Sequence, residues 1–259
     1  MALSAKREDY PENEKIFALG VGIWGFMLGC IIRNGIARGR QAMQETGVLR
    51  PLRAHALFQS NDLDEARERV AAVFCPHRLD TIGRGARLAA RHHHLRGDRI
   101  SLNYIEYGAK TLISPGMLEK FYLMQIPLSG GAAIANGSDR YVTGRGQAAV
   151  LNPHEPTSMI WGEGTAQVLI QIDRRAVSEH VSGLLGHGTE RPVTFRGALD
   201  LTRGAGAMLR QMAMFLVAEA DAGRAPFGVG QMRRQVEAML IGGLLEAHQH
   251  DFRDRLGRA

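Results

Sequence analysis

The sequence predicts an α+β fold in which a barrel or sandwich of short antiparallel strands is followed by two long helices. Three observations lead to this prediction. The composition, 45% hydrophobic and 22% charged, is typical of a globular protein. Apolar residues alternate with a period near two between residues 85 and 173, where turn residues recur at short intervals. After residue 176 the spacing becomes that of amphipathic helices.

Length, charge and cysteine content exclude several other classes of protein. With 259 residues and a net charge of only +6, the chain is long enough to bury a core and too apolar to be disordered. Cys30 and Cys75 lie far apart and offer no disulfide framework, which favours a reducing compartment. Only four of the 32 basic residues are lysines, and the arginines are scattered. The positive charge therefore does not indicate a surface that reads DNA bases.

Residues 1–50 form an N-terminal extension, predicted to be helical, with an apolar segment at residues 16–32. A helix that crosses a bilayer needs ~17–25 such residues, so this segment has the minimum length for a membrane anchor that would leave the rest of the chain in the cytoplasm. Two other interpretations remain open. Four glycines weaken any helix here, and translation could start at Met43, with residues 1–42 upstream of the true start.

Residues 60–75 are predicted to form the first helix of the folded domain. Asp62 and Glu65 have the spacing of a capping box, with Asp in place of the usual Ser or Thr. Apolar residues then follow at helical intervals, and Pro76 is expected to end the helix.

The segment between residues 85 and 173 is predicted to be all strands and turns. Glycine, proline, asparagine and aspartate separate the alternating stretches, and many short strands at close spacing favour a barrel or sandwich over a βαβ fold. The expected strands are Arg87–Leu95, Ile100–Tyr107, Thr111–Ser114, Phe121–Ser129, Tyr141–Thr143, Gln147–Leu151, Ser158–Trp161 and Gln167–Asp173.

The C-terminal third is predicted to be helical. Ala176–Leu185 forms a short helix that stops at Gly186, and Leu201–Ala220 and Val229–His250 form two longer ones. The short linker between the longer helices predicts an antiparallel pair packed on the barrel, on a partner chain or on both. Their predicted apolar faces are Leu201, Ala205, Met208, Leu209, Met212, Phe215 and Leu216, and Met232, Val236, Met239, Leu240, Gly243 and Leu244.

Three consecutive histidines, His92 to His94, are the residues with the clearest potential for metal binding. On a strand, His92 and His94 share one face and His93 points to the other. The metal-binding cupins use such a pair, but their motif then requires a carboxylate and a third histidine, and the matching positions here hold Asp98 in a turn and Ser158. We therefore expect no metal and no other cofactor.

Motifs for nucleophilic catalysis and phosphate binding are absent from the sequence, which contains no GxSxG or HExxH pattern and no phosphate-loop spacing. Cys75 and His77 are close in sequence, but no third group that would orient them is evident. Cys75 is expected to pack as a small apolar residue at the end of a helix. We therefore predict a binding protein and not an enzyme.

Taken in order, the segments resemble the ligand-binding domain of AraC/XylS-family transcriptional regulators, in its AraC-binding-like branch. The resemblance covers about three-quarters of the chain, from about residue 57 to residue 250. The stretches that carry it are Phe58–Val70, Phe74–Leu79, Gly85–Gly108, Phe121–Gly130 (FYLMQIPLSG), Gly146–Trp161 (GQAAVLNPHEPTSMIW) and Gln167–Gly186.

The resemblance implies a cupin-like antiparallel barrel, of the double-stranded β-helix or jelly-roll type, at residues 51–175 and a helical dimerisation region at residues 176–259. It implies binding of a small organic effector, homodimerisation through the C-terminal helices and control of transcription in the cytoplasm. The family's helix-turn-helix units have no counterpart before Ala259, so we expect no direct sequence-specific DNA binding from this chain. A cupin-type metalloenzyme and a membrane-tethered sensor, anchored only through residues 16–32, are the alternatives.

Five side chains on the predicted strands are candidates to face a ligand cavity. Pockets in barrels combine an apolar lining with a few polar groups, and these residues are polar or aromatic side chains on strand positions. The candidates are His92, His94, Tyr104, Trp161 and Gln171.

Overall fold

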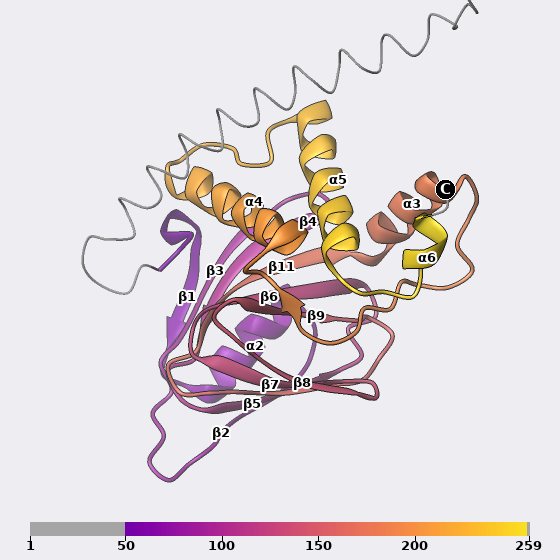
Figure 1. Cartoon of the computed structure of the whole chain (residues 1–259). Coiled ribbons are helices and arrows are strands. Elements are labelled where there is room, and N and C mark those ends of the chain that lie inside the picture. Colours follow the sequence, from indigo (N-terminus) through magenta and orange to yellow (C-terminus); the bar gives the residue numbers. More distant parts are fainter. Residues whose placement is uncertain (1–49, 258–259) are drawn as a thin grey trace, which may run out of the picture. The chain divides into compact units, whose positions relative to one another are not determined.

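Two antiparallel sheets face each other in the computed structural model, which describes residues 50–257 (Figure 1). The seven-stranded sheet consists, in spatial order, of β1 (Ala56–Ser60), β3 (Ala90–Arg96), β4 (Ile100–Glu106), β11 (Ala166–Asp173), β6 (Phe121–Ser129), β9 (Gln147–Leu151) and β12 (Leu199–Asp200). The five-stranded sheet consists of β2 (Arg78–Thr81), β5 (Thr111–Gly116), β10 (Thr157–Trp161), β7 (Gly131–Asn136) and β8 (Asp139–Gly144). Two facing antiparallel sheets confirm the cupin-like jelly-roll fold, without a continuously bonded barrel wall.

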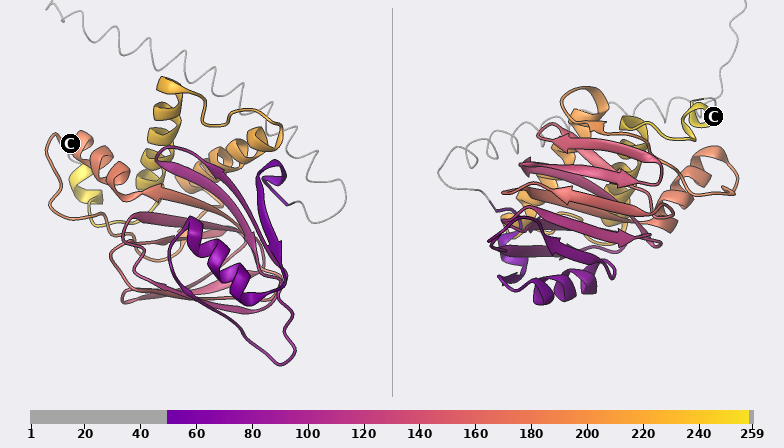
Figure 2. Two further views of the ribbon diagram at one scale, coloured as in Figure 1. Left: turned by 180° about the vertical axis from the view of Figure 1, so that it is seen from behind. Right: turned by 90° about the horizontal axis from the view of Figure 1, so that it is seen from below.

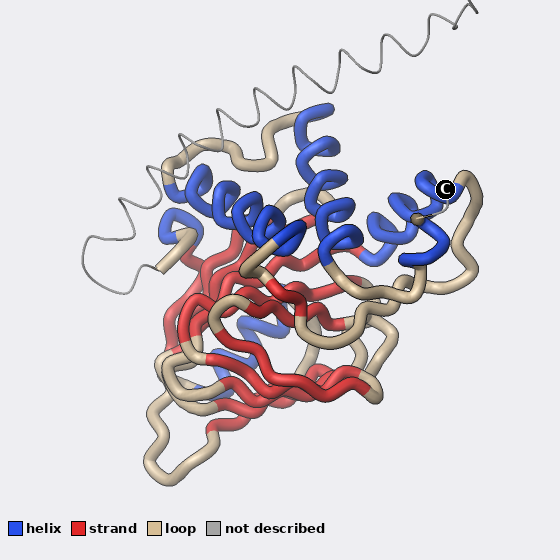
Figure 3. The backbone as a smooth tube through the Cα atoms, in the orientation of Figure 1, coloured by secondary structure: helices blue, strands red, loops and turns tan. Residues whose placement is uncertain are grey.

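The helices occupy two different places around these sheets (Figure 3). α2 (Leu63–Val73) lies along the side where the edge strands β1 and β2 part, and it contacts both (Figure 2). The others lie with the outer face of the seven-stranded sheet: η1 (Arg53–His55), α3 (Arg174–Leu185), α4 (Gly204–Asp221), α5 (Gly230–Ala247) and α6 (Arg253–Leu256). Among the described residues, no helix is long and apolar enough to cross a membrane. The expectations for segment 16–32 and for Met43 lie outside the described residues.

Predicted helix ends agree with the structure where local capping decides them. Asp62 is the N-cap of α2, and its carboxylate accepts a hydrogen bond of 2.8 Å from the Glu65 amide. Gly186 ends α3 in the left-handed conformation, with φ 74°. The expectation that Pro76 ends α2 was wrong, because the helix already stops at Val73, before Phe74 as C-cap.

Four strands were not predicted from the sequence, β1, β2, β7 and β12. β7 has the sequence GAAIAN, whose small side chains carry little strand signal, yet it pairs with both β8 and β10. β5 also continues through Pro115 and Gly116, which we expected to form a turn. The register between β5 and β10 shifts at this point. Pro115, which has no N–H to donate, is therefore not required to form a regular inter-strand hydrogen bond.

The two long helices also differ from their predicted ranges. α4 begins at Gly204 and not at Leu201, because β12 pairs with β9 just before it and the Asp200 carboxylate accepts from the Thr202 amide at 2.8 Å. α5 ends at Ala247, since His250 forms a β-bridge with Phe195.

The seven-stranded sheet separates two hydrophobic clusters. Leu102, Val168 and Ile170 face the helices, whereas Ile105 and Leu169 face the other sheet, as strand alternation requires. The helix-side cluster contains residues from both sides of the predicted boundary between residues 175 and 176. The cluster between the sheets surrounds the candidate site.

Candidate ligand-binding pocket

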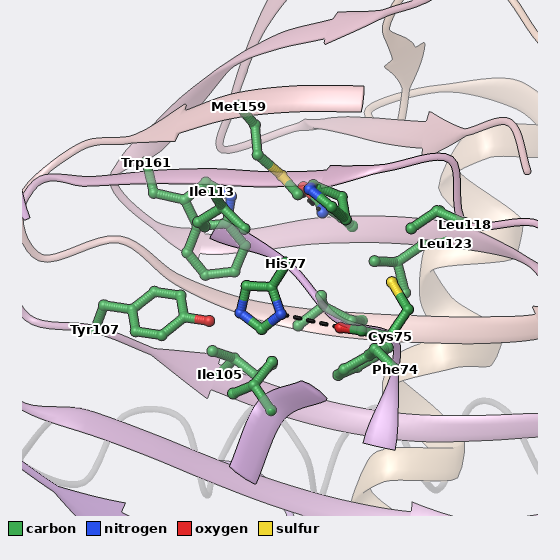
Figure 4. A pocket seen from close by; sticks show the side chains of 14 residues that line it. Phe74, Cys75, His77, Ile105, Tyr107, Ile113, Leu118, Leu123, Met159 and Trp161 are labelled. Atoms are coloured by element: carbon green, nitrogen blue, oxygen red, sulfur yellow. Dashed lines mark hydrogen bonds between the residues drawn. The ribbon is translucent and has the colours of Figure 1, made fainter. Parts of the chain in front are cut away.

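A small cavity lies between the two sheets, where the end of α2 and the segment after it close one side (Figure 4). Its volume is about 40 Å³, room for roughly three water molecules at ~10–15 Å³ each and too little for an aromatic ring. The lining residues are Val70, Phe74, Cys75, His77, Ile105, Tyr107, Ile113, Pro115, Leu118, Leu123, Gln125, Met159, Trp161 and Leu169.

A ligand larger than a few atoms requires some of these side chains to move. Phe74, Cys75 and His77 are half-buried and belong to the short segment between α2 and β2, whereas Leu123, Gln125 and Trp161 are buried on the sheets. Side chains on a connecting segment move more readily than those held on two hydrogen-bonded neighbours. We therefore expect the segment from Phe74 to His77 to be the part of the pocket wall that moves when a ligand enters.

Several polar atoms between the sheets have no partner within the described part of the chain. They are His77 Nε2, Gln125 Oε1, Trp161 Nε1, the Thr143 hydroxyl and both side-chain polar atoms of Gln167. Gln125 and Gln167 are completely buried. Most buried polar groups in proteins are hydrogen-bonded, and one left unpaired costs about 1–3 kcal/mol. Such a concentration of unpaired groups is typical of a site built for a molecule other than the protein itself.

The hydrogen bonds of the lining determine which of these atoms accept. The His77 Nδ1–H donates to the Cys75 carbonyl at 3.0 Å. Burial lowers the pKa of His77, so the ring is neutral at pH 7 and Nε2 carries a lone pair. The Gln125 amide nitrogen lies 3.3 Å from Met159 Sδ, and its Oε1 is left as the free acceptor. The pocket thus presents two acceptors.

The remaining polar groups of the lining are Tyr107, Trp161 and Cys75. The Tyr107 ring packs on the Trp161 ring at 5.5 Å, and its hydroxyl points toward His77 in Figure 4. Burial raises the pKa of the Tyr107 phenol, so the hydroxyl keeps its proton. Burial, with a contribution from Glu119, also raises the pKa of the Cys75 thiol, which makes it a poor nucleophile.

Three of the five predicted site residues lie together in one hydrogen-bonded chain beside the pocket. His92 Nε2 and His94 Nδ1 both donate to the Asn103 carbonyl oxygen, at 3.0 and 2.8 Å. The Asn103 amide donates to Ser101, whose hydroxyl donates to Gln171. The residues of this hydrogen-bonded chain, His92, His94, Asn103, Ser101 and Gln171, occupy the face of the seven-stranded sheet that looks toward the five-stranded sheet, but none of them lines the cavity.

The Phe74 ring separates this polar chain from the cavity. It stacks on the His92 ring at 5.6 Å with an interplanar angle of 15°. Behind it, His92 Nδ1 is buried without a hydrogen-bond partner among the described residues. His92 and His94 share one face, as predicted, and His93 lies on the other, bonded to the Pro51 carbonyl.

The other two predicted site residues differ, since Trp161 lines the cavity and Tyr104 does not. Trp161 lines the pocket from β10. Tyr104 does not face the cavity, because its side chain lies, like that of Leu102, on the face of β4 that looks toward the helices. There its ring contacts His93, and its hydroxyl donates to Glu106 at 2.8 Å. An error of one position in the strand register is enough to reverse a side chain in this way.

Sequence reasoning missed four residues that shape the pocket, Phe74, His77, Tyr107 and Gln125. Alternation with Leu123 on β6 would have indicated that Gln125 points inward. Phe74 and His77 have no comparable signal, because they lie between elements. Among the described residues, no three histidine, cysteine or acidic side chains come together as a metal site would require.

Comparison with known proteins identifies the family of this chain and related proteins. The model of the AraC-binding-like domain family matches residues 66–246. The chain is 26% identical to the probable thc operon regulatory protein of Rhodococcus erythropolis over 202 residues, which cover 77% of this chain and 61% of that protein. It therefore spans less than two thirds of that relative's length. The crystal structure of the AraC-like transcriptional activator CuxR is similar in fold, with a TM-score of 0.53, 10% identity, and coverage of 74% of this chain and 71% of that one.

Proposed function

The chain belongs to the AraC-binding-like domain family, and from that premise we propose that it binds a small organic effector between its two sheets as part of a transcriptional regulator. The observation that carries this proposal is the pocket with its unpaired buried polar atoms. An apolar lining with a few polar groups is the usual composition of a small-molecule site.

A binding role is favoured over catalysis by the state of the polar groups in the pocket. The thiol of Cys75 and the phenol of Tyr107 keep their protons, and the imidazole of His77 is neutral with one nitrogen already bonded to the backbone. The nearby histidines, His92 and His94, both donate to one amide oxygen and do not offer those nitrogens to a metal.

We further propose that the chain forms a homodimer through α4 and α5, in the cytoplasm. The relative from Rhodococcus is named as an operon regulatory protein. In such a regulator, effector binding in the pocket would change how two copies of the chain associate. We assign no residue of this chain to contact DNA bases. We propose that the chain acts by binding the effector and by forming the dimer.

Thermal shift measurements on the purified chain test the proposed pocket. We expect compounds from a panel of small aromatic acids, amines, amides and alcohols to raise the melting temperature, since a ligand at 100 times its Kd adds about 2.7 kcal/mol. The variant Ile113→Phe enlarges a buried side chain of the lining and should abolish the shift.

The matched control for this variant is Val142→Phe. Val142 is 68% exposed on β8, so the same kind of enlargement there leaves the pocket open. Compounds that shift the wild type, Ile113→Phe and Val142→Phe equally would bind elsewhere, and that result contradicts the proposal.

A further inference from the structure

We propose that this pocket selects an uncharged, largely apolar ligand that carries both a hydrogen-bond donor and an acceptor, such as an amide or an alcohol, and that it discriminates against carboxylates. The inference rests on the proposed function, because it names the chemical class of effector for that same site. It follows from the charges and hydrogen-bonding roles of the lining side chains.

No charged side chain is among the described residues that line the cavity. The guanidinium of Arg67 contributes to lowering the pKa of His77, but it is paired with Asp64 at 2.7 Å. The negative charge of Glu119 contributes to raising the pKa of the Cys75 thiol. A buried carboxylate ligand would thus find no cationic side chain among the described lining residues, and burying an unpaired ion is far costlier than burying a neutral polar group.

The free hydrogen-bonding positions also disfavour a carboxylate. His77 Nε2 and Gln125 Oε1 are acceptors, and a carboxylate oxygen brought against either of them would face a second lone pair. A ligand with an N–H or O–H group would satisfy these atoms. Such a group is present in a primary amide or an alcohol and missing from a carboxylate.

Donors are present in the lining as well, so the ligand needs an acceptor too. The Trp161 indole N–H is buried and has no partner within the described part of the chain, and it can only donate. The Tyr107 hydroxyl can donate or accept. A primary amide carries one carbonyl oxygen and two N–H groups, which matches one indole donor and two acceptors.

Two matched pairs of probes test the proposal on the wild-type chain, acetamide with acetate and benzamide with benzoate, at pH 7. Each pair has nearly the same shape and differs in charge and in the presence of an N–H group. Binding is followed by calorimetry and by the fluorescence of Trp161 in a Trp24→Phe background, since the chain has two tryptophans. We expect at least one amide to bind at least tenfold more tightly than its carboxylate.

The variant Gln125→Leu supplies an independent check. It removes one acceptor at nearly constant volume, so the affinity for the favoured amide should fall at least fivefold while that for the carboxylate does not fall. Gln147→Leu is the control, because this glutamine is exposed on β9, lies outside the cavity lining and should leave both affinities unchanged.

The outcomes separate this inference from the proposed function. A carboxylate that binds as well as its amide, with binding lost in Ile113→Phe, overturns the inference and supports the pocket as an effector site. An amide preference that persists unchanged in Gln125→Leu also counts against the assigned acceptor. If neither pair binds at 10-millimolar concentration and no compound of the panel shifts the melting temperature, both proposals fail.

Discussion

At the scale of single residues, Asn103 organises the polar interior of the seven-stranded sheet. It is completely buried, and one carbonyl oxygen accepts from both His92 and His94 while its amide donates to Ser101. Because one oxygen accepts from two rings, both histidines must present N–H groups there, which leaves His92 Nδ1 as a bare acceptor. A buried network of this kind is stable only while its protonation states are kept.

The stability of the protein should therefore depend on pH through His92. Burial lowers the pKa of His92 to about 4 from 6.5 in the unfolded chain, so the folded state prefers the neutral ring. This contribution is fully present above pH 6.5 and is lost as the pH falls from 6.5 toward 4. One pKa unit corresponds to about 1.4 kcal/mol, so between pH 7 and pH 4.5 the loss is about 2–3 kcal/mol.

Urea denaturation at pH 7 and pH 4.5 measures this dependence. The variant His92→Gln keeps a donor for Asn103 but does not titrate, and it should lose about 2–3 kcal/mol less than the wild type over this interval. His187→Gln changes an exposed histidine and serves as the control. An identical loss in the wild type and in His92→Gln would show that other groups carry the dependence.

At the scale of elements, the turn between β3 and β4 connects the sheet to α5. The backbone N–H of Arg99 donates to the carboxylate of Glu237, which is 2% exposed, at 3.0 Å. Asp98 forms an ion pair of 2.7 Å with Arg233 one turn earlier on the helix. Glycine is required at position 97, directly before Asp98 in the turn, because a Cβ there would lie 2.2 Å from the Ile100 carbonyl oxygen. The turn that joins these two strands is thus bonded directly to α5.

The buried contact should contribute far more to stability than the exposed one. Glu237→Ala leaves the Arg99 amide without its acceptor and should lower the free energy of unfolding by about 2 kcal/mol, whereas Glu237→Gln keeps an acceptor and should change it by less than about 1 kcal/mol. Arg233→Ala removes a pair whose Asp98 partner is mostly exposed and should cost at most ~1 kcal/mol.

Urea denaturation of the three variants at pH 7 gives these differences directly. A loss in Arg233→Ala as large as that in Glu237→Ala would mean that the ion pair, and not the buried hydrogen bond, joins the turn to α5.

At the scale of the whole molecule, the helix pair buries one face and leaves methionines on another. The residues of α4 and α5 that pack on the sheet include Leu209, Leu240 and Leu244. Met208, Met232 and Met239, which belong to the apolar faces predicted to pack on the barrel, on a partner chain or on both, are between 41% and 53% exposed. The sheet thus leaves some apolar side chains of both helices exposed, and methionines are frequent in interaction surfaces.

The proposed dimer can be tested at this surface. Met208→Glu and Met239→Glu each place a charge on it and should weaken the dimer at least tenfold, because an unpaired charge is costly in a protein interface. Val142→Glu, on an exposed position of β8, is the matched control. Sedimentation velocity over a range of protein concentrations measures the association, and a dimer that survives both methionine variants places the interface elsewhere.

Local patterns in the sequence were sufficient to predict those features that depend on one element at a time. Alternation predicted that His92 and His94 share a face, and capping chemistry predicted Asp62 and Gly186 at the ends of helices. These features follow from backbone geometry within a few residues. The order of such segments was also sufficient to indicate the family.

The tertiary structure alone decided which side chains meet. Trp161 and His77 line the same cavity, one from a strand and one from a segment between elements, and no periodicity relates them. Which sheet face Tyr104 occupies depends on the strand register, and a shift of one residue would reverse it. How exposed Met208 is depends on which side chains pack against α4. Periodicity shows that a side chain is apolar on one face, but only the packed neighbours determine what that face contacts and which of its polar atoms remain unpaired.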